Sequence, residues 1–143
     1  MPSFMRSGTT LIELTVVLAV VAILIAIVIP RTATMLDRAR VSSATTEAIA
    51  VFGAARQLAV HRGRRTSVLI DTAGASMLVL VGTDTAHRRT LGRAHGVRLE
   101  ATRDSISFHP TGIGYGGANL TLRITRGRAA DTVFVSRLGR VRH

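Results

Sequence analysis

The stretch TTLIELTVVLAVVAILIAIVI, residues 9–29, decides the architecture of this chain of 143 residues. From residue 14 to residue 29 it contains no charged side chain and a single polar one, Thr15. As a helix it would extend about 31 Å at roughly 1.5 Å per residue, which matches the ~30 Å hydrocarbon core of a bilayer. The stretch therefore predicts one membrane-spanning helix.

A cleaved secretory signal is the first alternative for this stretch. Such a signal ends at a small-residue cleavage site, and Arg31, Thr32 and Ala33 form a poor one.

A carboxylate inside the membrane costs about 2.5 kcal/mol or more unless it has a partner, so Glu13 is a candidate functional residue. The simpler interpretation is that Glu13 marks the boundary between the helix and water.

The residues around Glu13 carry a specific pattern. The sequence RSGTTLIEL, residues 6–14, resembles the type IV prepilin signature, a basic leader ending in Gly followed by a hydrophobic stretch with Glu as the fifth mature residue. The resemblance implies that a prepilin peptidase cuts between Gly8 and Thr9 on the cytoplasmic side and methylates the new amino terminus. Glu13 then becomes the fifth residue. Thr9 stands where the family usually has Phe.

The residue types in this pattern suit the implied chemistry. Gly8 has no side chain, so a protease can approach its backbone closely. Cleavage would create a cationic amine four residues before Glu13. When such helices bundle, the amine of one subunit neutralises Glu13 of its neighbour, whereas a misplaced subunit leaves a buried carboxylate unpaired at a cost of several kcal/mol. Glu13 would thus set the register of assembly with other pilins or pseudopilins.

Charge is concentrated outside the apolar stretch. All 19 basic residues are arginines, against eight acidic residues, and the net charge is +11. Residues 1–30 contain only Arg6 and Glu13, so the net charge belongs to residues 31–143. So basic a region is attracted to nucleic acid, anionic lipid or an acidic partner, although an Arg-rich solvated surface is the simpler interpretation. The chain has no cysteine, which excludes disulfides.

The charges give conflicting signals on orientation in the membrane. Three arginines closely follow the apolar stretch: Arg31, Arg38 and Arg40. The positive-inside rule, applied to these charges, predicts that the following domain stays in the cytoplasm. Long domains cross regardless of charge, and the cleavage pattern requires a cytoplasmic leader. We therefore expect a single-pass protein of the bacterial inner membrane with a periplasmic head.

A second, amphipathic helix segment follows Pro30, which is expected to kink the chain. Apolar residues recur at three- and four-residue steps, which predicts a helix over residues 32–61 that ends at His61-Arg62-Gly63. The small side chains on the inner face of this helix suit close packing on a sheet. The inner positions are Ala44, Ala48, Phe52, Ala55 and Ala59.

From Arg65 onward the apolar pattern has a period of two, which predicts strands. Residues 71–75 separate two apolar runs and predict a hairpin, and residues 82–96 are expected to form a surface loop. Further strands are expected over residues 97–101, 105–108, 120–125, 133–135 and 138–141.

These elements predict an α+β fold, with a long amino-terminal helix packed on an antiparallel β-sheet head. The expected organisation is a leader at residues 1–8, a membrane and assembly half of the helix at 9–30, an amphipathic half at 31–63, and a β-rich globular head at 64–143.

A second resemblance lies in the carboxy-terminal half. ISFHPTG, residues 106–112, and VFVSRLGRVR, residues 133–142, are similar to that half of GspH/FimT pseudopilins. This implies a minor pseudopilin of a type II secretion system, assembled into the periplasmic pseudopilus, rather than an enzyme. The alternative is a FimT-like type IV pilus minor pilin that binds DNA in natural transformation. An ordinary single-pass membrane protein is the third interpretation.

Arg140 and Arg142 are the candidate residues for binding DNA or another polyanion. GRVR, residues 139–142, resembles the GRxR ending of FimT-like pilins, some of which bind DNA. Alternate residues of a strand point to one face, and two guanidinium groups there suit phosphate contacts. The scarcity of aromatic residues argues against base stacking, and a structural or subunit-contact role is the simpler interpretation.

No catalytic residue, metal site or cofactor is expected. The five histidines have no metal-ligand spacing, and His109 is expected in a loop after a strand. The sequence GIGYGG, residues 112–117, lacks the Lys and the following helix of a phosphate-binding loop. No serine lies in a nucleophile elbow.

Overall fold

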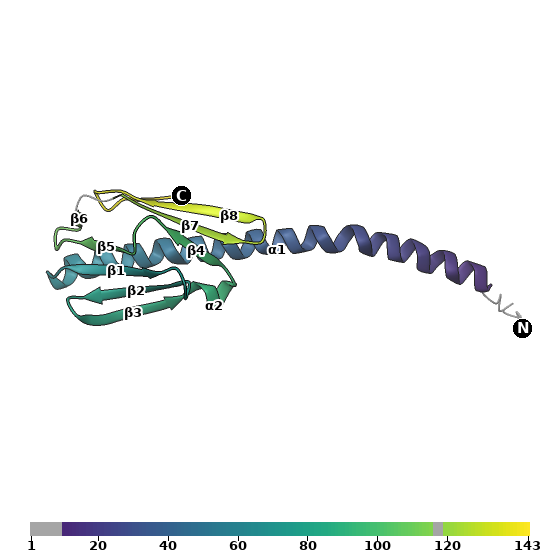
Figure 1. The fold of residues 1–143 in the computed structure, drawn as a ribbon, viewed down its shortest axis with the longest axis horizontal. Coiled ribbons are helices and arrows are strands. Elements are labelled where there is room, and N and C mark those ends of the chain that lie inside the picture. Colours follow the sequence, from purple (N-terminus) through teal and green to yellow (C-terminus); the bar gives the residue numbers. More distant parts are fainter. Residues whose placement is uncertain (1–9, 116–118) are drawn as a thin grey trace, which may run out of the picture. The chain divides into compact units, whose positions relative to one another are not determined.

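The computed structural model describes residues 10–115 and 119–143, without the side chains of residues 28–31. One helix, α1 (Leu11–Arg62), continues through Pro30 and precedes the strands. The chain divides into two compact units, residues 1–35 and Leu36–His143, and α1 runs through the boundary between them. The expected α+β fold is confirmed: a long amino-terminal helix packs against antiparallel sheets (Figure 1).

In the first unit, the side chains of α1 are exposed from Leu11 to Ile27. Leu11 keeps 82% of its surface and Ile23 keeps 62%. Within the described chain, α1 is the one helix long and apolar enough to cross a membrane. Burial of apolar surface is worth about 25 cal/mol per Å², so this segment needs lipid or other apolar helices around it. It fits a single-pass membrane anchor.

In the second unit, α1 buries the alanine face that the sequence predicts. Its small residues allow the backbone of the helix to approach the strands closely, and Phe52 fills the core between them. α1 ends at Arg62 because Gly63 takes a left-handed conformation with φ 57°. The fully buried positions of this face are Ala44, Ala48, Phe52, Ala55 and Ala59.

Two antiparallel sheets share the core with α1. The first has the order β3-β2-β1-β5-β6 and the second the order β4-β7-β8-β9. The predicted hairpin is confirmed as β1 paired with β2. The strands of the first sheet are β1 (Thr66–Asp71), β2 (Ser76–Val81), β3 (Asp84–Thr90), β5 (Ser105–Phe108) and β6 (Gly114–Tyr115). Those of the second are β4 (Arg98–Ala101), β7 (Leu120–Arg126), β8 (Ala129–Val135) and β9 (Val141–Arg142).

Two expectations about local structure are wrong. Residues 82–96 are not a loop: they contain β3 and the short helix α2 (Leu91–His95). β3 is an edge strand with polar side chains on both faces, so it lacks the apolar alternation of a strand. The last strand is also shorter than expected, because Leu138 and Gly139 belong to the turn before β9.

Candidate functional site

The predicted processing site, Gly8 and Thr9, lies outside the described residues. Glu13 occupies the first turn of α1 and is exposed. Its backbone N–H donates to Oγ1 of Thr10 at 3.3 Å, so Thr10 caps the helix. Thr10 and Glu13 have the spacing of a capping box, and a carboxylate favours the positive end of the helix dipole. A carboxylate in the first turn is thus favoured for a local reason that the sequence analysis did not consider, whereas the observed cap comes from the side chain of Thr10.

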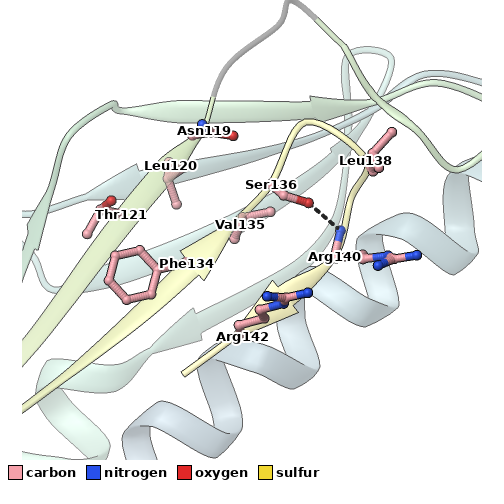
Figure 2. A pocket seen from close by; sticks show the side chains of 9 residues that line it. All are labelled: Asn119, Leu120, Thr121, Phe134, Val135, Ser136, Leu138, Arg140 and Arg142. Atoms are coloured by element: carbon pink, nitrogen blue, oxygen red, sulfur yellow. Dashed lines mark hydrogen bonds between the residues drawn. The ribbon is translucent and has the colours of Figure 1, made fainter.

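A groove of about 500 Å³ runs along the outer side of β7, β8 and the residues around β9 (Figure 2). The register places Thr121 opposite Phe134 and Phe134 opposite Arg142. Directly paired residues share a face of a sheet, so these three form a row across the outer face. The residues that line the groove are Asn119, Leu120, Thr121, Phe134, Val135, Ser136, Leu138, Arg140 and Arg142.

Arg140 and Arg142 both line this groove, but they do not share a strand. β9 contains Arg142, whereas Arg140 precedes it and pairs with Ser136. The N–H of Ser136 donates to the C=O of Arg140 at 2.8 Å, and the N–H of Arg140 donates to Oγ of Ser136 at 3.2 Å. Figure 2 shows both guanidinium groups reaching out from this segment. Both arginines are exposed.

The turn before Arg140 brings together the two segments that resemble GspH/FimT pseudopilins, residues 106–112 and 133–142. Gly114 donates its N–H to the C=O of Arg137 at 3.1 Å, which joins β6 to the turn between β8 and β9. Gly139 has φ 72°, and a Cβ atom there would lie 2.8 Å from the carbonyl oxygen of Gly112. Only glycine fits this contact without a shift. His109 follows β5 outside any strand, as expected.

Two ion-pair clusters were missed by the sequence analysis. Glu47 lies 2.8 Å from Nε2 of His95 and 3.6 Å from Nε of Arg89. Asp37 lies 2.8 Å from Nε of Arg126. A signal was present: Asp37 and Glu47 are the only acidic residues between positions 31 and 62, in a strongly basic chain.

No group of three or more potential metal ligands occurs in residues 10–115 and 119–143. His61 and His87 line the same open hollow beside α1, and its lining in the described part of the chain contains no carboxylate and no third histidine. His109 lies 3.1 Å from Oγ1 of Thr111 within its own loop. Part of the glycine-rich sequence forms β6, and residues 116–117 lie outside the described part.

A family described as "Type II transport protein GspH" matches residues 44–139, which include the alanine face, strands β1 to β8 and the turn at Gly139 but not β9. The chain belongs to the GspH family. It is therefore a type IV pilin-like protein, and this family consists of structural pilins and pseudopilins. A comparison with curated proteins finds no match.

Solved structures agree with this assignment at the level of the fold. The type IV minor pilin FimU of Pseudomonas aeruginosa superposes with a TM-score of 0.63 at 18% identity, covering 76% of this chain and 90% of FimU. The minor pseudopilin EpsH from the type 2 secretion system of Vibrio cholerae gives a TM-score of 0.60 at 16% identity, covering 72% of this chain and 94% of EpsH. The GspH-family chain thus has the fold of minor pilins and minor pseudopilins.

Proposed function

We propose that this GspH-family chain is a minor pseudopilin of a type II secretion system, held in the inner membrane by residues 9–30 and exposing residues 64–143 to the periplasm. A prepilin peptidase would remove residues 1–8. The single observation that carries the proposal is the match of residues 44–139 to the type II transport family. The exposed apolar side chains of α1 support it, because a filament core of packed helices would bury them.

Glu13 would act in assembly with other pseudopilins through charge neutralisation. Cleavage before Thr9 leaves an amine close to Thr10, which caps α1, and Glu13 lies in the first turn. In a bundle of such helices, an unpaired carboxylate is strongly unfavourable, so the subunit that brings an amine to Glu13 is favoured over other registers.

Deletion of the gene in its own bacterium tests the proposal. We expect the exported substrates of the secretion system to accumulate in the periplasm, and a plasmid copy to restore their release. Intact secretion together with loss of pili or of DNA uptake would replace this function by the second candidate.

The second candidate is a FimT-like minor pilin that binds DNA. The observation in its favour is the convergence of Arg140 and Arg142 on one groove, with both side chains exposed. Two guanidinium groups at such a site suit adjacent phosphates. The fold shared with FimU is compatible with this candidate.

A further inference from the structure

An open strand edge borders the groove. β9 is the last strand of its sheet and, among the residues that the structure describes, pairs only with β8, with Arg142 opposite Phe134. One step further along, the C=O of Arg140 accepts from the N–H of Ser136 and therefore faces β8. Successive residues of an antiparallel strand turn their N–H and C=O groups to opposite sides. Val141 consequently presents its backbone N–H and C=O to the open edge.

The side chains along this edge are cationic on the outer face. Arg142 shares that face with Phe134, its paired residue, and Arg140 lies two residues earlier in the same groove. Among residues 10–115 and 119–143, no carboxylate forms an ion pair with either guanidinium group. The two cations are therefore available to a partner.

The remainder of the groove is not what a phosphate backbone alone requires. Phe134 is 52% exposed and Leu138 is 59% exposed, and both line the groove beside the two arginines. Large apolar side chains next to charged ones are typical of a protein–protein interface. The combination of an open edge, apolar side chains and two unpaired cations indicates an extended polypeptide as ligand.

We propose that β9 is a docking edge for an extended segment of another protein subunit, which adds a strand beside Val141 and carries two acidic side chains two residues apart. Main-chain hydrogen bonds to Val141 would supply affinity. The two carboxylates would lie beside Arg140 and Arg142, because neighbouring residues on adjacent strands share a face. A second copy of β9 is excluded as the partner, since it would place arginines against arginines.

Only the identification of the partner as a neighbouring assembly subunit rests on the proposed function. The edge itself is tested with the full chain in neutral detergent micelles, using fluorescence anisotropy of labelled peptides. The probe is Gly-Val-Glu-Val-Glu-Val-Gly, and the control has the same composition with the two glutamates adjacent. We expect the probe to bind about tenfold more tightly than the control, because only alternate carboxylates reach both arginines.

Three variants separate the contributions. Arg140→Ala/Arg142→Ala should lower the affinity for the probe about tenfold. Val141→Pro keeps both cations but removes the N–H at the open edge, where no ladder bond is lost, and should also weaken binding about tenfold. Arg88→Ala/Arg93→Ala removes the same charge from exposed positions on β3 and α2 and should leave the affinity unchanged.

Several results would overturn the docking edge. Equal affinity for the two peptides, or an equal loss in the Arg88/Arg93 control, would assign binding to net charge. Full affinity in Val141→Pro would exclude strand addition. If the peptide fails to bind while a 20-base-pair duplex binds in a manner that needs Arg140 and Arg142, the groove is a nucleic-acid site. A gene deletion that leaves secretion intact, with peptide binding preserved, would refute the proposed function but not the edge.

Discussion

Nε of Arg126 lies 2.8 Å from Oδ1 of Asp37, a residue 89 positions earlier in the chain. Nη1 of the same side chain donates to the C=O of His95 at 2.7 Å and to the C=O of Gly96 at 3.1 Å. One arginine of β7 thus joins α1 to the end of α2. Gly96 has φ 66°, and a Cβ atom there would collide with the guanidinium group, so the arginine also depends on the absence of a side chain.

Replacement of this arginine should destabilise the second unit. Arg126→Ala removes the donors to a carboxylate and two carbonyls, and a hydrogen bond that involves a charged group contributes a net stabilisation of about 1.5–3 kcal/mol. We expect a loss of about 2 kcal/mol, measured by thermal unfolding of the full chain in detergent. Arg128→Ala, an exposed arginine on the next turn, is the control. Equal destabilisation by both variants would mean that the cluster contributes nothing specific.

The second prediction concerns the packing of the alanine face of α1 against the sheets. Ala55→Leu adds three carbon atoms at a fully buried position, and such overpacking costs about 1–3 kcal/mol. Ala50→Leu adds the same atoms to an exposed position of α1 and should have little effect. Comparison of the two unfolding midpoints checks this. Similar midpoints would show that the helix shifts easily on the sheets.

The sequence predicted the elements that bury one face. The steps between Ala44, Ala48 and Phe52 follow the helical period because only one side of α1 meets the sheets. β3 was not predicted because Ala86 is its one half-buried residue and the other six are exposed, so burial imposes no alternation on its sequence. Its polar side chains are those of an edge strand, which proteins keep hydrophilic to prevent association.

The candidate site was predicted only in part. The alternating arginines of GRVR, residues 139–142, identified Arg140 and Arg142. Phe134 was not singled out, because it lies between two other apolar residues, Val133 and Val135. Its exposure follows from alternation along β8, because Val133 and Val135 point into the core, but three consecutive apolar residues do not indicate which of them point inward. The contact of Asp37 with Arg126 was also not predictable, because it depends on how two distant segments pack.

Processing at Gly8 is the third prediction. Co-expression with a prepilin peptidase should yield a chain that begins at Thr9, and Gly8→Val should block the cut because a branched side chain hinders access to the backbone. Intact-mass spectrometry distinguishes the two products. An uncleaved wild-type chain, or a product cut near Ala33, would contradict the assignment of residues 1–8 as a leader.

The fourth prediction separates two roles of Glu13. Glu13→Gln keeps a side chain suited to the capping box but removes the charge, whereas Glu13→Ala removes both. If Glu13 pairs with the amine of a neighbour, both variants should insert and be cleaved normally yet enter filaments poorly. Incorporation is measured by cross-linking and immunoblotting of sheared filaments.

Normal incorporation of Glu13→Gln, with a defect in Glu13→Ala, would assign Glu13 to helix capping instead of register selection. Normal incorporation of both variants would leave it as a marker of the water boundary. Thr10→Ala is the matched control, because it removes the cap observed at 3.3 Å without touching the carboxylate.

The fifth prediction concerns the second candidate function, DNA binding through the groove. Binding by phosphate neutralisation weakens with salt, with a log–log slope near −0.9 per contacted phosphate on duplex DNA. If Arg140 and Arg142 each contact a phosphate, Arg140→Ala/Arg142→Ala should reduce the magnitude of the slope by about two. The measurement is a salt titration of the full chain with a fluorescent duplex.

The wild-type protein should bind duplex DNA weakly in any case, because a net charge of +11 attracts a polyanion without a dedicated site. The comparison with Arg88→Ala/Arg93→Ala, which loses the same charge elsewhere, is therefore decisive. A larger drop in slope for the groove variant supports DNA binding at the groove, whereas equal drops assign the binding to overall charge. Arg140→Lys/Arg142→Lys adds a test of geometry: it should keep the salt slope but regain only part of the affinity, because lysine lacks the planar fork that contacts two phosphate oxygens at once.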